Sequence, residues 1–255
     1  MSPAARKIVL PIFAFALFIS LWELISRSLE IPVYLLPSPS AIWEGGAKLG
    51  TTLFTNTAVT LKTILLGFAL SCAVGIPLGV LVSVNRLTSE AIYPLIVFLN
   101  AIPIISIAPI LVVIFGTDET TRLIIVTLTA FFPIMVATAT GIMDTPQEML
   151  DLSRVAGAGP LTEILTIRLP HAVPFIFGGL RIGVTVAVIG AVVAEFVNAN
   201  RGLGYLVTSS TAQFAIPTAM ACVVMLAVVS VILYEAVNWT HRLLFGWSLR
   251  NDPGK

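Results

Sequence analysis

The segment Asp151–Pro170 reads Asp-Leu-Ser-Arg-Val-Ala-Gly-Ala-Gly-Pro-Leu-Thr-Glu-Ile-Leu-Thr-Ile-Arg-Leu-Pro. It carries four charged side chains within twenty residues of a chain that has few charges elsewhere, at Asp151, Arg154, Glu163 and Arg168. Such a segment cannot lie in hydrocarbon, yet apolar runs precede and follow it. We therefore expect a compact loop between two membrane spans, exposed to water and available to contact a partner.

The composition indicates a membrane protein. Of the 255 residues 57% are hydrophobic and only 11% are charged, whereas an ordinary soluble domain carries roughly 25% charged residues. The net charge of +1 gives no indication of a nucleic-acid partner. Cys72 and Cys222 fall inside apolar runs, and His171 and His241 have no neighbours with metal-ligand spacing. We expect buried thiols, no metal site and no cofactor.

The apolar runs predict an all-α integral membrane protein of one domain, residues 1–255, with about six transmembrane helices. The first run is too long for a typical signal peptide and lacks a cleavage pattern, so it is predicted to be an uncleaved span. The predicted spans cover residues 8–25, 59–83, 91–116, 122–143, 174–197 and 217–239, with a loop over 144–173. A short helix is expected to start after Ser38 and to end near Gly45 and Gly46.

Small residues recur every fourth position in two spans. The second span has Gly67, Ser71, Gly75, Gly79 and Ser83, and the fifth has Gly179, Gly183, Ala187 and Ala191, followed by Glu195. Helix backbones approach closely in lipid where small residues share a face. We interpret both faces as helix-packing surfaces.

Candidates for a translocation pathway come from polar residues and helix breaks. The third span contains Asn100, Pro103 and Pro109, and is either one broken helix or two segments. In the fourth span Thr127 and Phe131 share a helical face with Thr138, and Glu195 is an ionisable group within a span. Asn100, Thr127, Phe131 and Glu195 are the pathway candidates, with a packing role as the alternative for each.

The distribution of positive charge predicts the orientation. With six spans, one side collects Arg6, Lys7, Arg86, Arg154, Arg168, Arg242, Arg250 and Lys255, and the other collects Arg27, Lys48, Lys62, Arg122 and Arg201. The positive-inside rule then places both termini and the 144–173 loop in the cytoplasm. Within that loop, residues 147–156 have helical spacing that stops at Gly157, and Pro160 can begin a second short helix ending before Pro170.

This loop resembles the cytoplasmic coupling loop of ABC importer permeases, whose motif is Glu-Ala-Ala, three residues, Gly, nine residues, then Ile-x-Leu-Pro. Asp151 stands at the Glu position, Gly157 follows at the same interval, and Ile167, Leu169 and Pro170 match. Leu152 and Ser153 replace the two alanines. The resemblance assigns ATPase coupling to Asp151, Ser153, Arg154, Gly157, Ile167, Leu169 and Pro170.

Further segments are similar to the nitrate/sulfonate/taurine branch of these permeases, which has relatives for pyrimidine-type vitamin precursors. They are Leu36–Pro39, Gly75–Gly79, Gly178–Arg181, Ala194–Glu195 and Gly202–Gly204. The resemblance implies a type I importer fold in a bacterial or archaeal inner membrane. It also implies cytoplasmic ABC ATPase subunits, an extracytoplasmic substrate-binding protein and a second permease copy, as a homodimer or a heterodimer.

The expected function is the permease subunit of an ATP-driven importer for a small organic anion, a sulfonate- or nitrate-like solute, or a vitamin precursor. The chain has no Gly-x-x-x-x-Gly-Lys-Ser/Thr loop to bind ATP phosphates, so hydrolysis is expected on a separate subunit and not on this chain. The alternatives are a secondary transporter or channel, which needs an ion-binding centre near mid-span, and an intramembrane enzyme, which needs a nucleophile–base pair or metal ligands.

Overall fold

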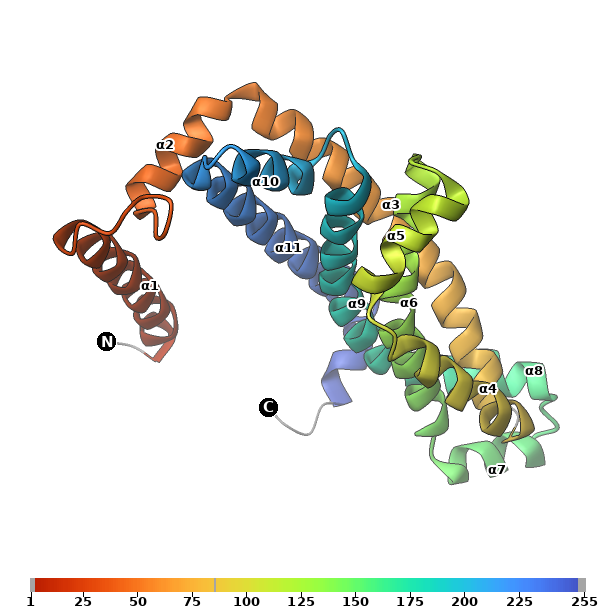
Figure 1. Cartoon of the computed structure of the whole chain (residues 1–255). Helices are drawn as coiled ribbons and strands as arrows, with labels where there is room; N and C mark the ends of the chain where they lie inside the picture. The colour runs from red at the N-terminus through yellow and green to blue at the C-terminus, as the bar shows by residue number, and fades with distance from the viewer. Residues whose placement is uncertain (1–2, 85, 252–255) are drawn as a thin grey trace.

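The computed structural model describes residues 3–84 and 86–251, and the regular structure in those ranges is helical. Lys255, counted above among the tail charges, lies outside the described residues. Figure 1 shows an elongated bundle of long helices with shorter helices at both ends. The helices are α1 (Pro3–Ser28), α2 (Pro39–Leu49), α3 (Thr51–Val84), α4 (Arg86–Asn100), α5 (Ile104–Phe115), α6 (Glu119–Met143), α7 (Gln147–Val155), α8 (Pro160–Glu163), the π-helix η1 (Ile164–Arg168), α9 (Leu169–Asn198), α10 (Leu203–Ala212), α11 (Ile216–Leu244) and the 3₁₀ helix η2 (Gly246–Asn251).

Helix α6 is the centre of the bundle because α3 and α9 both pack closely against it. On the α3 side, a Cβ added at Gly75 would lie 2.8 Å from the carbonyl oxygen of Phe131, and one at Gly79 would lie 2.7 Å from that of Met135. Ser71 donates its hydroxyl to the carbonyl of Gly67 at 2.8 Å and contacts that of Thr127 at 3.3 Å. The predicted small-residue face of α3 is therefore a packing surface.

The small residues of α9 contact a neighbouring face of α6, since Gly183 and Gly75 both approach Ile134. A Cβ at Gly183 would lie 2.8 Å from the side chain of Ile134, and one at Gly190 would lie 2.9 Å from the Thr129 hydroxyl. The predicted face extends to Ala187 and Ala191, which are fully buried. Because lipid supplies no hydrophobic force between helices, this close backbone contact and its dispersion energy hold the three helices together.

Adjacent glycines in α9 allow this packing to be tested. A Cβ at Gly179 would lie 2.5 Å from the Cβ of Ala137 on α6, whereas one at Gly178 would meet nothing within 4 Å. We expect Gly179→Ala to lower stability by about 1–3 kcal/mol because α6 and α9 must separate. Gly178→Ala should be neutral or stabilising by up to about 1 kcal/mol, because alanine favours the helix. Thermal unfolding in one detergent measures both, and equal effects would contradict the packing assignment.

The third predicted span is two helices and not one. Helix α4 ends at Asn100, the break covers residues 101–103, and α5 begins at Ile104 with Pro103 as its N-cap. Pro103 cannot donate to the preceding turn and restricts Ile102 to extended conformations, so the helix stops before it. Pro109, in contrast, is accommodated inside α5.

The pair α4–α5 nevertheless makes a single crossing. Along α3 and α6 the contacts advance together, from Gly67 beside Val126 to Gly79 beside Thr138, so the two helices run in the same direction. The intervening α4 and α5 must therefore return the chain to the end where α3 began. Among the described residues five helices are long and apolar enough to span a membrane, and α5 is a shorter apolar helix. The pair supplies the remaining crossing.

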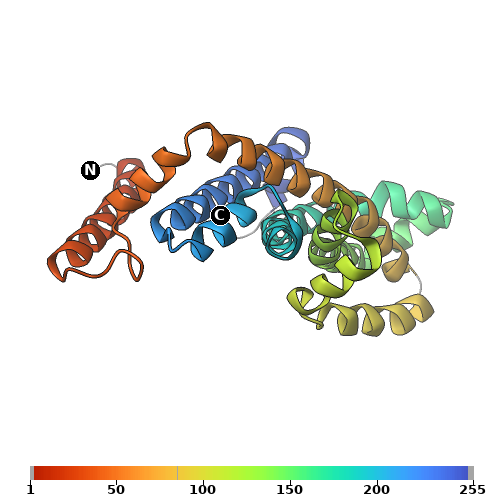
Figure 2. The same ribbon diagram turned by 45° about the horizontal axis from the view of Figure 1, so that its top comes forward.

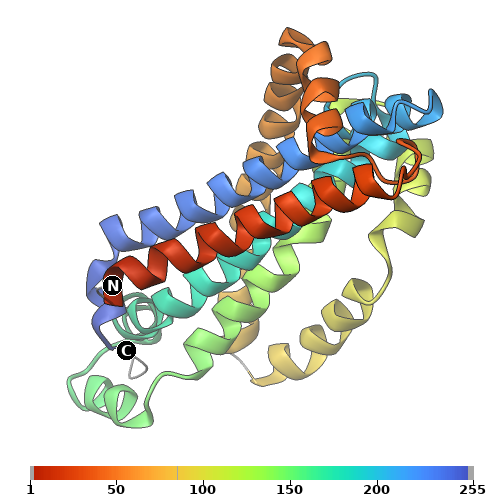
Figure 3. The same cartoon turned by 90° about the vertical axis from the view of Figure 1, so that its left-hand side faces the viewer.

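The loop around α7 and α8 marks one end of the bundle. Figure 2 shows α1 and α2 at one lateral edge of the molecule and α7 and α8 at the other. In Figure 3 the first residues of α1 and the short helix η2 lie at the end that carries α7, while α2 and α10 lie at the other end. The first and last described residues thus lie at the same end of the bundle, as an even number of crossings requires.

Helix α2 is longer than expected because its glycines serve packing and not termination. Ser38 caps the helix by accepting from the amide of Ala41 at 3.3 Å. The helix continues through Gly45 and Gly46 and ends at Gly50, whose φ is +51°. A Cβ at Gly45 would lie 2.7 Å from the carbonyl carbon of Pro217, so this glycine allows the start of α11 to approach the α2 backbone.

Candidate functional site

The first candidate region is the knob, which we define as α7, α8 and the turn between them. Helix α7 ends where the sequence indicated, since Gly157 has a φ of +80°. The amide of Gly157 donates to the carbonyl of Arg154 and that of Ala158 donates to Ser153, both at 3.0 Å. This pair of bonds is a Schellman motif, which requires a left-handed residue at the Gly157 position. The motif fixes the angle at which the chain leaves α7.

The second half of the knob is continuous with α9, which corrects the expectation of a short helix ending before Pro170. Helix α8 passes through the π-helix η1 directly into α9, and the amide of Leu169 donates to the carbonyl of Ile164, five residues back. Pro170 follows immediately and has no N–H to donate. The wider π turn precedes the proline and lets the helix continue through it.

One buried carboxylate joins the two halves of the knob. Glu163 is 8% exposed and accepts from Arg168 Nη2 at 2.6 Å and from Arg168 Nε at 2.9 Å. Arg154 on α7 approaches the other oxygen of Glu163 at 3.3 Å and also lies 3.4 Å from Asp151. This network links α7 to η1 through charge-assisted hydrogen bonds.

The predicted coupling residues divide into an outer and an inner group. Asp151 and Arg154 are exposed on α7, whereas Ser153 is buried beneath it. Leu169 packs against a core cluster of α6 and α9 residues, and Ile167 and Pro170 are half-buried at the base of the knob. Leu169 therefore attaches the base of the knob to α6 and α9.

The outer surface of the knob is apolar although the segment is charged. Val155 is 88% exposed and Leu152 is 72% exposed on α7. Leu161 and Leu165, which follow the Schellman turn, are also exposed. Several exposed large apolar side chains on neighbouring short helices are typical of a protein-binding surface.

The second candidate region lies at the opposite end, around Glu195 of α9. This side chain is 2% exposed. One oxygen accepts from the Thr60 hydroxyl of α3 at 2.8 Å, and the other accepts from the Gly204 amide of α10 at 2.7 Å. The Thr60 oxygen in turn accepts from the Leu203 amide at 2.8 Å. We call this arrangement the Glu195 clamp, since it ties α3, α9 and α10 together.

Two glycines make the Glu195 clamp possible. Gly202 has a φ of +118°, and a Cβ there would overlap the carboxylate carbon of Glu195. A Cβ at Gly204 would lie 2.8 Å from the Cβ of Glu195. The Gly202 amide also donates to the Asn56 side chain at 2.6 Å. The Gly-Leu-Gly sequence thus places the Gly204 N–H against a buried carboxylate whose burial would otherwise be costly.

The structure does not bring the four pathway candidates together. Asn100 is exposed at the end of α4, beside the break before α5. Thr127 contacts the carbonyl of Gly67 at 3.4 Å in the contact between α3 and α6, and Phe131 packs near Val82 and Met135. Glu195 forms the clamp. A pathway role for these residues stays a prediction.

Sequence reasoning missed two features of these regions. Glu163 was noted as a charge of the loop but not as the acid that joins Arg154 to Arg168. The cavity formed by Lys62, Arg122 and Arg201 was also missed. The available signal was that all three cations fall near span ends on the side opposite the knob.

Within the described residues no group of three or more His, Cys, Asp or Glu side chains could hold a metal ion.

The Glu195 clamp leads to a test that compares two threonines of α3. Thr60→Val removes a donor to Glu195 and an acceptor for Leu203, so we expect a loss of about 1–3 kcal/mol of stability. Thr57→Val is the matched control, because Thr57 donates only within its own helix, to the carbonyl of Leu53 at 2.7 Å. Thermal unfolding and limited proteolysis of the 199–202 link measure the difference. Equal unfolding temperatures for the two variants would contradict the clamp.

The helix order and the two regions define a class of protein. The structure matches the inward-facing MetNI methionine ABC transporter with a TM-score of 0.68 at 20% identity, over 76% of this chain and 97% of that one. The fold is therefore that of a type I ABC importer permease.

Comparison with known sequences gives the family. Residues 75–246 match the family described as binding-protein-dependent transport system inner membrane component. The formylaminopyrimidine transport permease protein ThiX of Halalkalibacterium halodurans is 35% identical over 93% of this chain and 95% of its own length. The bicarbonate transport system permease protein CmpB of Synechococcus elongatus is 28% identical over 96% and 90%. The chain belongs to this family of ABC transporter permeases and is a multi-pass membrane protein.

Proposed function

We propose that the chain is the permease subunit of an ATP-driven importer whose cytoplasmic ATPases bind the knob. The observation that supports this most directly is the apolar outer surface of α7, where Leu152 and Val155 are mostly exposed beside the Schellman turn. Burying such a surface in an ATPase groove would remove apolar area from water. The missing phosphate-binding loop requires that ATP hydrolysis take place on that partner.

The rest of the assembly follows from the same proposal. A substrate-binding protein would deliver the solute at the end carrying α10, and a second permease copy, as a homodimer, would complete the pathway. The knob and both termini would face the cytoplasm of a cell with an inner membrane. ThiX and CmpB are named for a pyrimidine and for bicarbonate, and we propose a small polar solute of that size range for this chain.

An ion-coupled secondary transporter is less well supported. Such a protein needs an ionisable group that faces the pathway near mid-membrane. Both oxygens of Glu195 are already engaged by Thr60 and Gly204. Arg181 Nη2 contacts His241 Nδ1 at 2.8 Å, while the buried Nε of Arg181 has no hydrogen-bond partner among the described residues.

Two glycines of the knob provide the decisive experiment. A Cβ at Gly157 or at Gly159 would meet nothing within 4 Å, but only Gly157 of the pair has a positive φ. We expect Gly157→Val to break the Schellman turn, because a β-branched residue disfavours the left-handed region. In proteoliposomes with the ATPase and the binding protein, uptake should fall about tenfold or more while the permease still inserts and folds, since coupling depends on the angle of α7.

Gly159→Val is the control. Gly159 has extended backbone, with φ −75° and ψ 164°, which a valine before Pro160 also adopts. Its uptake and solute-stimulated ATP hydrolysis should remain close to those of the unmodified protein. Normal uptake and normal stimulation of ATP hydrolysis in Gly157→Val would refute the assignment of the knob as the coupling element.

A further inference from the structure

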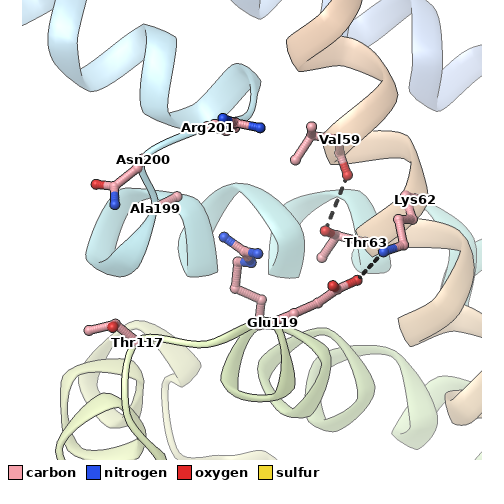
Figure 4. Close-up of a pocket in the computed structure, with 9 residues that line it drawn as sticks. Val59, Lys62, Thr63, Thr117, Glu119, Ala199, Asn200 and Arg201 are labelled. Carbon is pink, nitrogen blue, oxygen red and sulfur yellow. Dashed lines mark hydrogen bonds and ion pairs between the residues drawn. The ribbon is translucent and has the colours of Figure 1, made fainter.

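A cavity of about 320 Å³ lies at the end of the bundle away from the knob. Helix α6 begins at this cavity and ends at the knob 25 residues later, so the two lie roughly 35 Å apart along that helix. The lining comes from α3, from the start of α6 and the turn before it, and from the link between α9 and α10 (Figure 4): Val59, Lys62, Thr63, Thr117, Glu119, Arg122, Ala199, Asn200 and Arg201.

The lining carries more positive than negative charge. Lys62, Arg122 and Arg201 face a single acid, Glu119. Lys62 Nζ lies 2.8 Å from Glu119 Oε1, and Figure 4 shows this pair joining α3 to α6 along one side of the cavity. Within the described chain neither Arg122 nor Arg201 has a carboxylate within ion-pair distance. The charge of Arg122 acts on Glu119 and Glu195 from a longer distance, and the donors of both guanidinium groups make no direct ion pair with them.

Arg122 carries the strongest indication. Its Nε atom is buried and has no hydrogen-bond acceptor among the described residues. An unsatisfied buried donor destabilises the protein, and the side chain that carries it lines the cavity. Guanidinium groups present their N–H donors in a planar fork that matches the two oxygens of a carboxylate or sulfonate.

The third side of the cavity is held in place by the Glu195 clamp. The link residues Ala199, Asn200 and Arg201 lie between Glu195 and Gly202, whose amide donates to Asn56. The Leu203 and Gly204 amides that follow are bound to Thr60 and Glu195. The position of Arg201 relative to α3 is thus set by buried hydrogen bonds on both sides of the link.

We propose that this cavity is a binding site for the oxyanion group, carboxylate or sulfonate, of the transported solute as it enters the permease. A volume near 300 Å³ is at the lower end for small-molecule sites, which fits a solute of a few heavy atoms or the charged part of a larger one. Arg122 and Arg201 bind the oxyanion, and the Lys62–Glu119 pair closes the side toward α3. The role of this cavity as an entrance for the solute rests on the proposed import function.

Anion binding by the full-length permease alone tests this site. We would titrate potassium methanesulfonate and potassium acetate into the protein in dodecyl maltoside by calorimetry, with potassium chloride holding the ionic strength constant. We expect saturable binding, and a dissociation constant that rises roughly tenfold or more in Arg122→Gln and in Arg201→Gln. Arg122→Lys should be intermediate, because it keeps the charge and loses the fork.

Lys48→Gln is the matched control, since it removes one exposed cation from the same end outside the cavity. It should leave the dissociation constant unchanged. Each variant is compared by its unfolding temperature in chloride, so that a folding defect is separated from lost binding. Equal effects of Lys48→Gln and Arg122→Gln would show a general charge effect and overturn the site, as would the absence of saturation in the unmodified protein.

A parallel titration in phosphatidylcholine nanodiscs separates a solute site from a lipid site. Binding with the same dissociation constant supports the proposal, whereas binding that disappears in nanodiscs shows that a lipid phosphate occupies the arginines and overturns it. These measurements need neither ATP nor a partner.

Failure of anion binding would leave the coupling role of the knob intact, and normal uptake in Gly157→Val would leave the anion site intact.

Discussion

The close approach of α3 and α9 to adjoining faces of α6 is the constraint on which the structure depends. Glycines at the contacts bring backbone carbonyls of α6 within reach of α3, and any side chain there would force the helices apart. Because hydrocarbon offers no hydrophobic gain, this contact supplies the cohesion of the bundle. It also sets the positions of the three helices relative to one another along the axis of the bundle. Both functional regions are built at the ends of those same helices, so their geometry follows from the same packing.

Patterns confined to one helix or one turn could be predicted from the sequence. Four-residue spacing identified both small-residue faces, and Gly157 marked the end of α7. The motif from Asp151 to Pro170 likewise located the knob between two apolar spans. These features depend on neighbours within a few residues. Local physical chemistry, such as the left-handed backbone of a helix terminus, therefore determines them.

Features that depend on distant partners could not be predicted. Gly45 looked like a helix end but serves the approach of Pro217, 172 residues away. The carboxylate of Glu195 looked like a pathway group, and only the fold shows that Thr60 and Gly204 satisfy it. The cavity unites three segments that are far apart in the chain. Pro103 and Pro109 also look alike in sequence, yet only the first interrupts the helix.

The π turn at η1 has a mechanical consequence. Because it carries α8 through Pro170 without a break, residues 160–198 are helical throughout, although Figure 1 shows α8 to one side of α9 and not along its axis. One end of this helical segment belongs to the knob, and the other bears Glu195 and leads into the link that carries Arg201. A movement imposed on α8 therefore reaches the start of α9 through an uninterrupted helical backbone. The backbone that joins the knob to the link bearing Arg201 is thus helical from Pro160 to Asn198.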